Sequence, residues 1–341
     1  MLLYVQFPEW INPQIVPGLP FQWYGMMYLV AFTITFLLTR RQLRASDMVV
    51  SDDDLMNVFF WAIIGLLIGG RLFATLIFND SWYYWQNPQR IFWPFAPDGT
   101  FVGLQGMNFY GGLVGGTLGA VLYARWKRID VLELGDMIIA AVPLGYTFGR
   151  IGNFINGELY GRVTTAPWGV VFPNAERLSL SEPWVARIMT QVGMTPSDAV
   201  NGMINLPRHP TQLYEGFTEG ILAWLVIWPF LRHRKPYRGF LIAFYILWYG
   251  LWRFGIDYLR MPLAGDYILR LAADPTISTH RFVSLWNFTD SQVWSGLMIL
   301  SGGLLLVVFK RMDQRRILQE NQRARSKTRL SRSQRRRLRK N

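Results

Sequence analysis

Residues 58–77 read VFFWAIIGLLIGGRLFATLI, an apolar run in which Arg71 is the one charged residue. An α-helix rises about 1.5 Å per residue, so it needs roughly 20 apolar residues to cross the ~30 Å hydrocarbon core of a membrane. Comparable runs recur at Trp23–Leu38, Gly103–Ala124, Met137–Ile155, Leu213–Leu231, 240–258 and Val293–Phe309. The sequence therefore predicts an all-α, polytopic membrane protein with seven transmembrane helices.

Composition restricts the chemistry available to the chain. Of its 341 residues 51% are hydrophobic, and cysteine is absent, which excludes disulfides, a thiolate nucleophile and cysteine metal ligands. The three histidines, His209, His233 and His280, are too scattered to indicate a metal site. We therefore expect no cofactor and no bound metal. Residues 1–22 contain four prolines and no basic residue, so the first span is expected to stay as an anchor rather than be cleaved as a signal peptide.

The basic residues predict the orientation in the membrane. Four segments hold most of the 35 Lys and Arg residues, and each follows an odd-numbered span: 40–44, 125–128, 232–238 and the tail from Lys310. Basic residues accumulate on the cytoplasmic side of membrane proteins. The N-terminus is therefore expected outside and the C-terminus in the cytoplasm, which agrees with an odd number of spans.

Two segments outside the expected spans differ in character. Residues 157–211 mix glycine, proline and charged residues around a short helical candidate near Pro183–Val192, and we expect a small extracytoplasmic head within a catalytic domain of residues 1–310. Residues 311–341 are strongly basic and are expected to form a disordered cytoplasmic tail. Such a tail can attract anionic lipid head groups or RNA; the lack of interleaved aromatic residues favours lipid, and no nucleic-acid partner is expected.

The end of the fourth span carries the densest polar cluster. Residues 149–162 read GRIGNFINGELYGR and contain Arg150, Asn153 and Glu158 among four glycines, the last of which is Gly161. Arg150 and Asn153 are three residues apart and so share one face of a helix. Charges at the edge of a membrane helix are costly unless they are paired or bind a ligand, which indicates a functional site. The alternative is a structural clamp between Arg150 and Glu158.

The sixth span carries a second polar stripe. Tyr249, Arg253, Asp257 and Arg260 are spaced by four, four and three residues, so they lie along one side of a helix. The planar fork of an arginine bonds two phosphate oxygens at once. Arginines on two spans therefore suggest an anionic head group held between helices, whereas the structural alternative is a simple Arg253–Asp257 pair.

Three further segments add polar candidates at the expected membrane boundary. RHPTQLYE at 208–215 places His209 before the fifth span, with a pKa near neutrality that suits proton transfer. GLQGMNFYGGLVGG at 103–116 suggests a tightly packed helix interface, with Tyr110 as a polar exception. QWYGMMYL at 22–29 places Tyr24 at interface depth, where an aromatic belt residue is the plain alternative.

Together these segments resemble one family. GRIGNFINGELYGR closely matches the signature of prolipoprotein diacylglyceryl transferase, the first enzyme of bacterial lipoprotein maturation. RHPTQLYE, QWYGMMYL, YGGLVG and YGLWRFGIDYLR are also similar to segments of that family, in the same order. The resemblance covers residues 1 to about 260 well and the last span more loosely. It implies a multi-pass enzyme of the bacterial inner membrane.

The resemblance also implies a reaction and its residues. A lipobox cysteine of a prolipoprotein attacks the phosphate-bearing glyceryl carbon of phosphatidylglycerol, a thioether forms, and glycerol phosphate leaves. Arg150 and Arg253 match positions regarded as essential, and phosphate binding is their expected role. The expected phosphatidylglycerol-binding residues are Arg150, Asn153, Glu158, Tyr24, Tyr249 and Gly161.

The chain departs from the family at one position. Many members have a histidine before the GG of the third span, where it has been proposed as the base, and this chain has Tyr110. A tyrosine with a pKa near 10 is a poor base unless nearby cations lower that pKa. The base is therefore left open between Tyr110, His209 and no dedicated base, and residues 261–291 are also longer than the family suggests.

A membrane transporter for an anionic solute or lipid is the alternative function. It would require polar residues near mid-membrane on several spans, whereas the polar residues here cluster at the outer ends of spans four to six. A non-enzymatic scaffold would leave those ordered polar segments without a purpose. The sequence favours the transferase over both.

Overall fold

The computed structural model describes residues 4–16, 22–78, 81–95, 99–100, 106–262, 269–270, 280–281 and 284–338. The chain is mostly helical and forms two compact units, one of Met1–Thr35 with Ile138–Asn341 and one of Phe36–Met137. We call them unit 1 and unit 2. The boundaries fall within α1 (Trp23–Arg44) and α5 (Val131–Ile139), so each of these helices contributes to both units.

Unit 2 is built around two helices that pack closely. Its elements are α2 (Asp52–Phe73), the π-helical turn η1 (Ala74–Phe78), α3 (Ser81–Gln86), η2 (Pro88–Arg90) and α4 (Phe109–Trp126). Ser51 caps α2 by accepting a hydrogen bond from the Asp54 amide, and acidic residues in the first turn favour this helix start. A Cβ atom on Gly115 would lie 2.1 Å from the carbonyl oxygen of Gly65, so only glycine permits this approach. The predicted close packing of the third span is confirmed.

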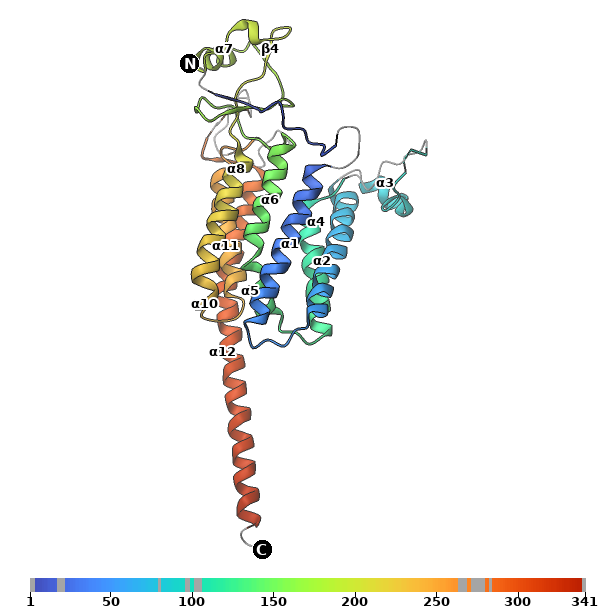
Figure 1. Ribbon diagram of the computed structural model, residues 1–341, viewed down its shortest axis with the longest axis vertical. Helices are drawn as coiled ribbons and strands as arrows, with labels where there is room; N and C mark the ends of the chain where they lie inside the picture. The colour runs from blue at the N-terminus through green and yellow to red at the C-terminus, as the bar shows by residue number, and fades with distance from the viewer. Residues whose placement is uncertain are drawn as a thin grey trace. The chain divides into compact units, whose positions relative to one another are not determined.

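Unit 1 contains the helices that carry the polar segments at 149–162, 208–215 and 244–260, together with the helices that follow or pack against them. They are α6 (Val142–Ile155), α8 (Thr211–Glu215), η4 (Gly216–Leu222), α9 (Ala223–Val226), η5 (Ile227–Leu231), α10 (Arg232–Arg234), α11 (Phe240–Ile256) and α12 (Asp290–Leu338). The stretch from α8 to α10 runs through successive α- and π-helical turns. α11 and α12 lie side by side in opposite directions, and α12 continues beyond the start of α11 (Figure 1).

A small head forms at one end of these helices (Figure 1). It contains β1 (Val5–Gln6) paired with β2 (Val170–Val171), β3 (Leu178–Ser179) paired with β4 (Met203–Ile204), α7 (Pro183–Gln191) and η3 (Pro196–Asp198). Val185, Val192, Ile204 and Leu206 form its buried core. The short helix expected near Pro183–Val192 is confirmed as α7. A further strand pair joins β5 (Leu269–Arg270) to β6 (Asn287–Phe288), while most of 261–291 lies outside the described residues.

The apolar runs do not all become single straight helices. Within the described residues two helices, Asp52–Ile77 and Asp290–Arg323, are long and apolar enough to cross a membrane, or three if α5 and α6 count as one span. α5 and α6 meet at a bend of 48°, inside the expected span Met137–Ile155. α4 begins at Phe109 because Asn108 caps it, later than the predicted start at Gly103, which lies outside the described residues.

Candidate functional site

The signature segment leaves helix α6 through a tight turn. α6 ends at Ile155, and Gly157 and Leu159 then take positive φ angles of 65° and 58°. The turn brings Glu158 back toward the helix end, where its Oε1 accepts hydrogen bonds from Asn153 (2.9 Å) and Asn156 (3.3 Å). A non-glycine residue in this backbone region is uncommon and is often found at functional sites.

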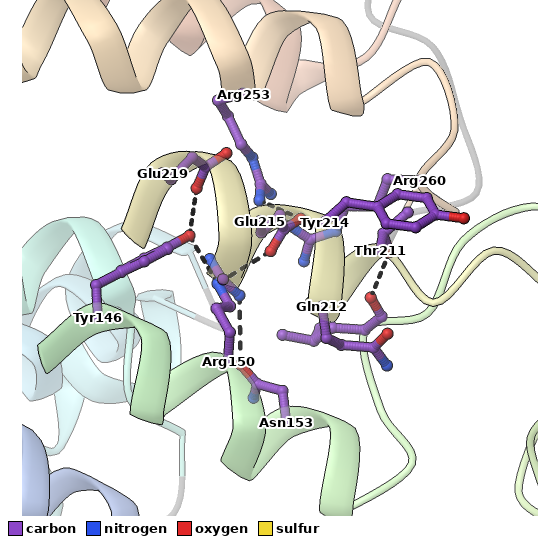
Figure 2. Close-up of polar contacts among 12 residues, drawn as sticks. Tyr146, Arg150, Asn153, Thr211, Gln212, Tyr214, Glu215, Glu219, Arg253 and Arg260 are labelled. Carbon is purple, nitrogen blue, oxygen red and sulfur yellow. Dashed lines mark hydrogen bonds and ion pairs between the residues drawn. The ribbon is translucent and has the colours of Figure 1, made fainter. Parts of the chain in front are cut away.

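Three arginines from two segments of unit 1 converge on one carboxylate. Glu215 on α8 is fully buried, and its Oε2 lies 3.0 Å from Nε of Arg150. Its Oε1 lies 2.5 Å from Nη1 of Arg253 and 3.2 Å from Nη1 of Arg260 (Figure 2). We call these four residues the arginine cluster. α6, α8 and α11 therefore meet at a single polar centre.

The arginine cluster is almost removed from solvent. The side chains of Arg150, Arg253 and Arg260 are 12%, 10% and 8% exposed, and that of Glu215 is 0% exposed. Charges at such depth cost several kcal/mol each by order of magnitude unless they are paired. Arg253 is paired a second time, with its Nε 3.3 Å from Oδ1 of Asp257. The predicted Arg253–Asp257 pair is therefore present, but Arg253 also forms an ion pair with Glu215.

Arg150 reaches Glu158 through an intermediate residue. Its Nη1 donates to Oδ1 of Asn153 at 3.3 Å, and Asn153 in turn donates to Glu158. Its Nε donates to the hydroxyl of Tyr146 at 2.7 Å (Figure 2). The direct Arg150–Glu158 clamp considered from the sequence is replaced by a relay through Asn153, because the carboxylate that pairs with Arg150 is Glu215.

Gly161 permits three backbone segments to meet beside the cluster. Its amide donates to the carbonyl of His209 at 2.8 Å, and the amide of Arg162 donates to the carbonyl of Leu259 at 2.7 Å. A Cβ atom on Gly161 would lie 2.5 Å from the Leu259 carbonyl oxygen. The Gln212 side chain closes the arrangement by donating to the Glu158 carbonyl at 2.5 Å. Gly161 thus acts on the site through backbone packing.

His209 precedes α8 and belongs to a short chain of hydrogen bonds. Its Nδ1 lies 3.2 Å from the hydroxyl of Tyr214, which also accepts a hydrogen bond from Nε1 of Trp168 at 2.6 Å. Burial lowers the pKa of His209, because the charged imidazolium loses solvation. The imidazole is therefore neutral at pH 7 and able to accept a proton.

The remaining predicted site residues lie in different surroundings. The ring of Tyr249 makes an edge contact with that of Tyr146, with centroids 5.8 Å apart. Tyr24 packs against Gly152 of α6 and shares a hydrogen bond of 2.9 Å with the hydroxyl of Tyr28. Tyr110 is the second residue of α4 in unit 2, and its role stays a prediction.

Sequence reasoning missed three residues of this site. Glu215 lies within RHPTQLYE, where the sequence points to His209, and the sequence patterns select neither Tyr146 nor Glu219. The signal available for Tyr146 and Glu219 was periodicity, since Tyr146 precedes Arg150 by one helical turn and Glu219 follows Glu215 by one turn. In the described part of the chain no group of three or more His, Asp or Glu side chains could hold a metal ion.

Comparison with known proteins assigns the family. The model of the prolipoprotein diacylglyceryl transferase family matches residues 12–308. The chain belongs to this family. A relative from Treponema denticola, named phosphatidylglycerol–prolipoprotein diacylglyceryl transferase, is 43% identical over 317 residues, which cover 88% of this chain and 93% of the relative.

Two more relatives carry the same name. The protein from Treponema pallidum is 41% identical over 314 residues, 88% of this chain and 94% of its own length. The protein from Chlorobaculum tepidum is 36% identical over 305 residues, 88% of this chain and 90% of its own. The chain is therefore a membrane-embedded transferase of lipoprotein biosynthesis, and the alternative of a transporter is set aside.

Proposed function

We propose that this transferase moves the diacylglyceryl group of phosphatidylglycerol onto the lipobox cysteine of prolipoproteins, and that the arginine cluster binds the phosphate. The observation that carries the proposal is the convergence of Arg150, Arg253 and Arg260 on Glu215. Among the described residues, the hydrogen bonds and ion pairs of these arginines use Nε and Nη1 atoms. We therefore expect their Nη2 groups to bind the phosphate oxygens.

The charge of the cluster suits the departure of a phosphate ester. The cysteine sulfur forms a bond to the glyceryl carbon, the carbon–oxygen bond breaks, and glycerol phosphate leaves with the electron pair. Positive groups already in place stabilise the charge that develops on the leaving oxygen. Glu215 holds the three cations together before the lipid arrives, so less reorganisation accompanies the reaction.

The thiol must lose its proton for sulfur to attack, because the thiolate is the nucleophile. His209 supports the role of base, since it is neutral at pH 7 and its ring is bonded to Tyr214. Tyr110 stays the second candidate, with hydrogen-bonded positioning of a substrate as its expected role. The substrate-binding roles of Asn153, Glu158, Tyr24, Tyr249 and Gly161 are part of the same proposal.

The proposed topology has seven spans in the bacterial inner membrane, with the N-terminus outside and the C-terminus in the cytoplasm. The distribution of basic residues supports this orientation. The bent pair α5–α6 and the π-helical stretch α8–α10 would each be one span. The arginine cluster would then open on the outer side, together with the head.

Purified protein supplied with phosphatidylglycerol and a lipobox peptide tests the proposal. We expect thioether-linked diacylglyceryl peptide, and we expect Arg150→Ala and Arg253→Ala to lower its rate of formation by at least roughly 100-fold, the usual effect of losing a group that stabilises developing charge. Arg177→Ala, which removes an exposed arginine of the head, is the matched control and should leave the rate unchanged. Full activity of Arg253→Ala would refute the phosphate role.

A further inference from the structure

Arg150 is connected to two carboxylates besides Glu215, each through one neutral residue. On one side Asn153 accepts from Nη1 and donates to Glu158. On the other side the Tyr146 hydroxyl accepts from Nε at 2.7 Å and donates to Oε2 of Glu219 (Figure 2). Asn153 and Glu158 belong to the signature segment, whereas Tyr146 and Glu219 have no role in the function proposed above.

Glu219 is a buried acid that the fold holds in place. It lies in η4 with 0% exposure, and within the described residues its Oε1 makes no hydrogen bond. The same helical turn is fixed at its backbone, because Tyr245 donates to the Glu219 carbonyl at 3.1 Å and Trp248 to the Thr218 carbonyl at 2.9 Å. Burying a carboxylate is costly, so an acid retained at this depth indicates a functional use.

The close contact of α6 with η4 sets the geometry of this connection. A Cβ atom on Gly220 would lie 2.1 Å from the Oγ1 atom of Thr147, so the two helices approach as nearly as a glycine allows. Thr147 also donates to the Gly216 carbonyl at 3.1 Å. Tyr146, next to Thr147 on α6, is therefore held opposite Glu219.

We propose that Tyr146 and Glu219 are positioning residues that orient the guanidinium of Arg150 toward the phosphate. The side chain of Glu219 accepts a hydrogen bond from the Tyr146 hydroxyl, which polarises the hydroxyl and makes its oxygen a stronger acceptor for the arginine. Arg150 is then fixed at Nε by Tyr146 and Glu215 and at Nη1 by Asn153. Its Nη2 group then faces the substrate, and the side chain loses little further conformational freedom when the phosphate binds. The inference rests on the proposed phosphate role of Arg150.

Steady-state kinetics with the two substrates varied separately test the inference. Tyr146→Phe and Glu219→Leu should each raise the apparent KM for phosphatidylglycerol by about 10-fold, the usual scale for loss of a hydrogen bond to a charged group. The KM for the lipobox peptide should stay unchanged. Glu219→Gln keeps an oxygen that can accept the Tyr146 hydroxyl, so it should retain more activity than Glu219→Leu.

A double-mutant cycle separates a relay from two independent effects. If Glu219 acts through Tyr146, the Gln and Leu variants of Glu219 should behave alike once Tyr146→Phe is present, and each double variant should match Tyr146→Phe alone. Tyr245→Phe is the matched control, because it removes a hydroxyl of α11 that contacts the same turn but donates to the backbone carbonyl of Glu219. It should lower the Tm and leave both KM values unchanged.

The results of these experiments distinguish a failure of the relay from a failure of the phosphate site. A folded Tyr146→Phe protein with KM for phosphatidylglycerol within twofold of the parent would overturn the relay, and so would equal rises in both KM values. The relay would also be overturned if the effects of the two single substitutions on the KM for phosphatidylglycerol were additive in the double variants. If Arg150→Ala itself kept full activity, the phosphate site would be wrong; if Arg150→Ala were inactive and Tyr146→Phe normal, the relay alone would be wrong.

Discussion

Glu215 illustrates how one side chain can organise several others. Arg150, Arg253 and Arg260 carry like charges, and their approach within a buried site would be strongly unfavourable without the carboxylate between them. Each arginine contacts Glu215 through one nitrogen of its guanidinium, which leaves its other nitrogens as further donors. In the proposed function, a phosphate group therefore binds to a site that is already assembled.

The role of His209 can be tested through the pH dependence of transfer. Burial lowers its pKa from the usual 6.5, so the neutral form persists through the neutral range and is lost only as the pH falls through the lowered value. We expect the parent rate to decline on acidification. His209→Gln should lower the rate at pH 7 by roughly 100-fold or more, the scale of general-base catalysis, and should remove the decline.

His233→Gln is the matched control for this experiment, since His233 is an exposed histidine on α10. Its rate and pH profile should follow those of the parent. An unchanged profile for His209→Gln would contradict its role as base. Tyr110→Phe would then be the next variant to measure.

At the scale of elements, the sequence predicted which segments carry the site better than it predicted their shapes. α11, Phe240–Ile256, falls within the expected run 240–258, because its apolar residues are continuous. Hydropathy does not predict the bend between α5 and α6, since the two helices together are apolar enough for one span. The π-helical turns from η4 to η5 likewise leave the hydropathy of the run unchanged.

The packing of α2 against α4 gives a test at the element scale. Gly115→Ala would place a methyl group against the Gly65 carbonyl, so we expect a loss of stability of about 1–3 kcal/mol, as for other overpacked interfaces. Gly112→Ala is the control on the same helix, because its added carbon would meet the flexible Leu66 side chain at 3.4 Å. Thermal unfolding in detergent measures both, and equal Tm values would contradict the close approach.

At the scale of the whole chain, the family and the reaction class could be recognised from ordered polar segments. The ion pairs within the site could not be predicted from the sequence. Glu215 is 65 positions from Arg150, and nothing in the local pattern selects Glu215 over Glu158 or Glu219 as its partner. Distant pairing depends on how α6, α8 and α11 pack, which periodicity alone does not determine. Composition does not select Tyr146 either, because aromatic residues are common on membrane helices.

The proposed orientation of the chain can be tested with single cysteines, since the protein contains none. Asn174→Cys in the head, Ala45→Cys after α1 and Gln319→Cys on α12 introduce exposed thiols. In spheroplasts, a membrane-impermeant maleimide should label Asn174→Cys at once. It should label the other two only after the membrane is permeabilised, because basic segments stay in the cytoplasm. Labelling of Gln319→Cys in intact spheroplasts would place the end of α12 outside and contradict an odd number of spans between it and an outward N-terminus.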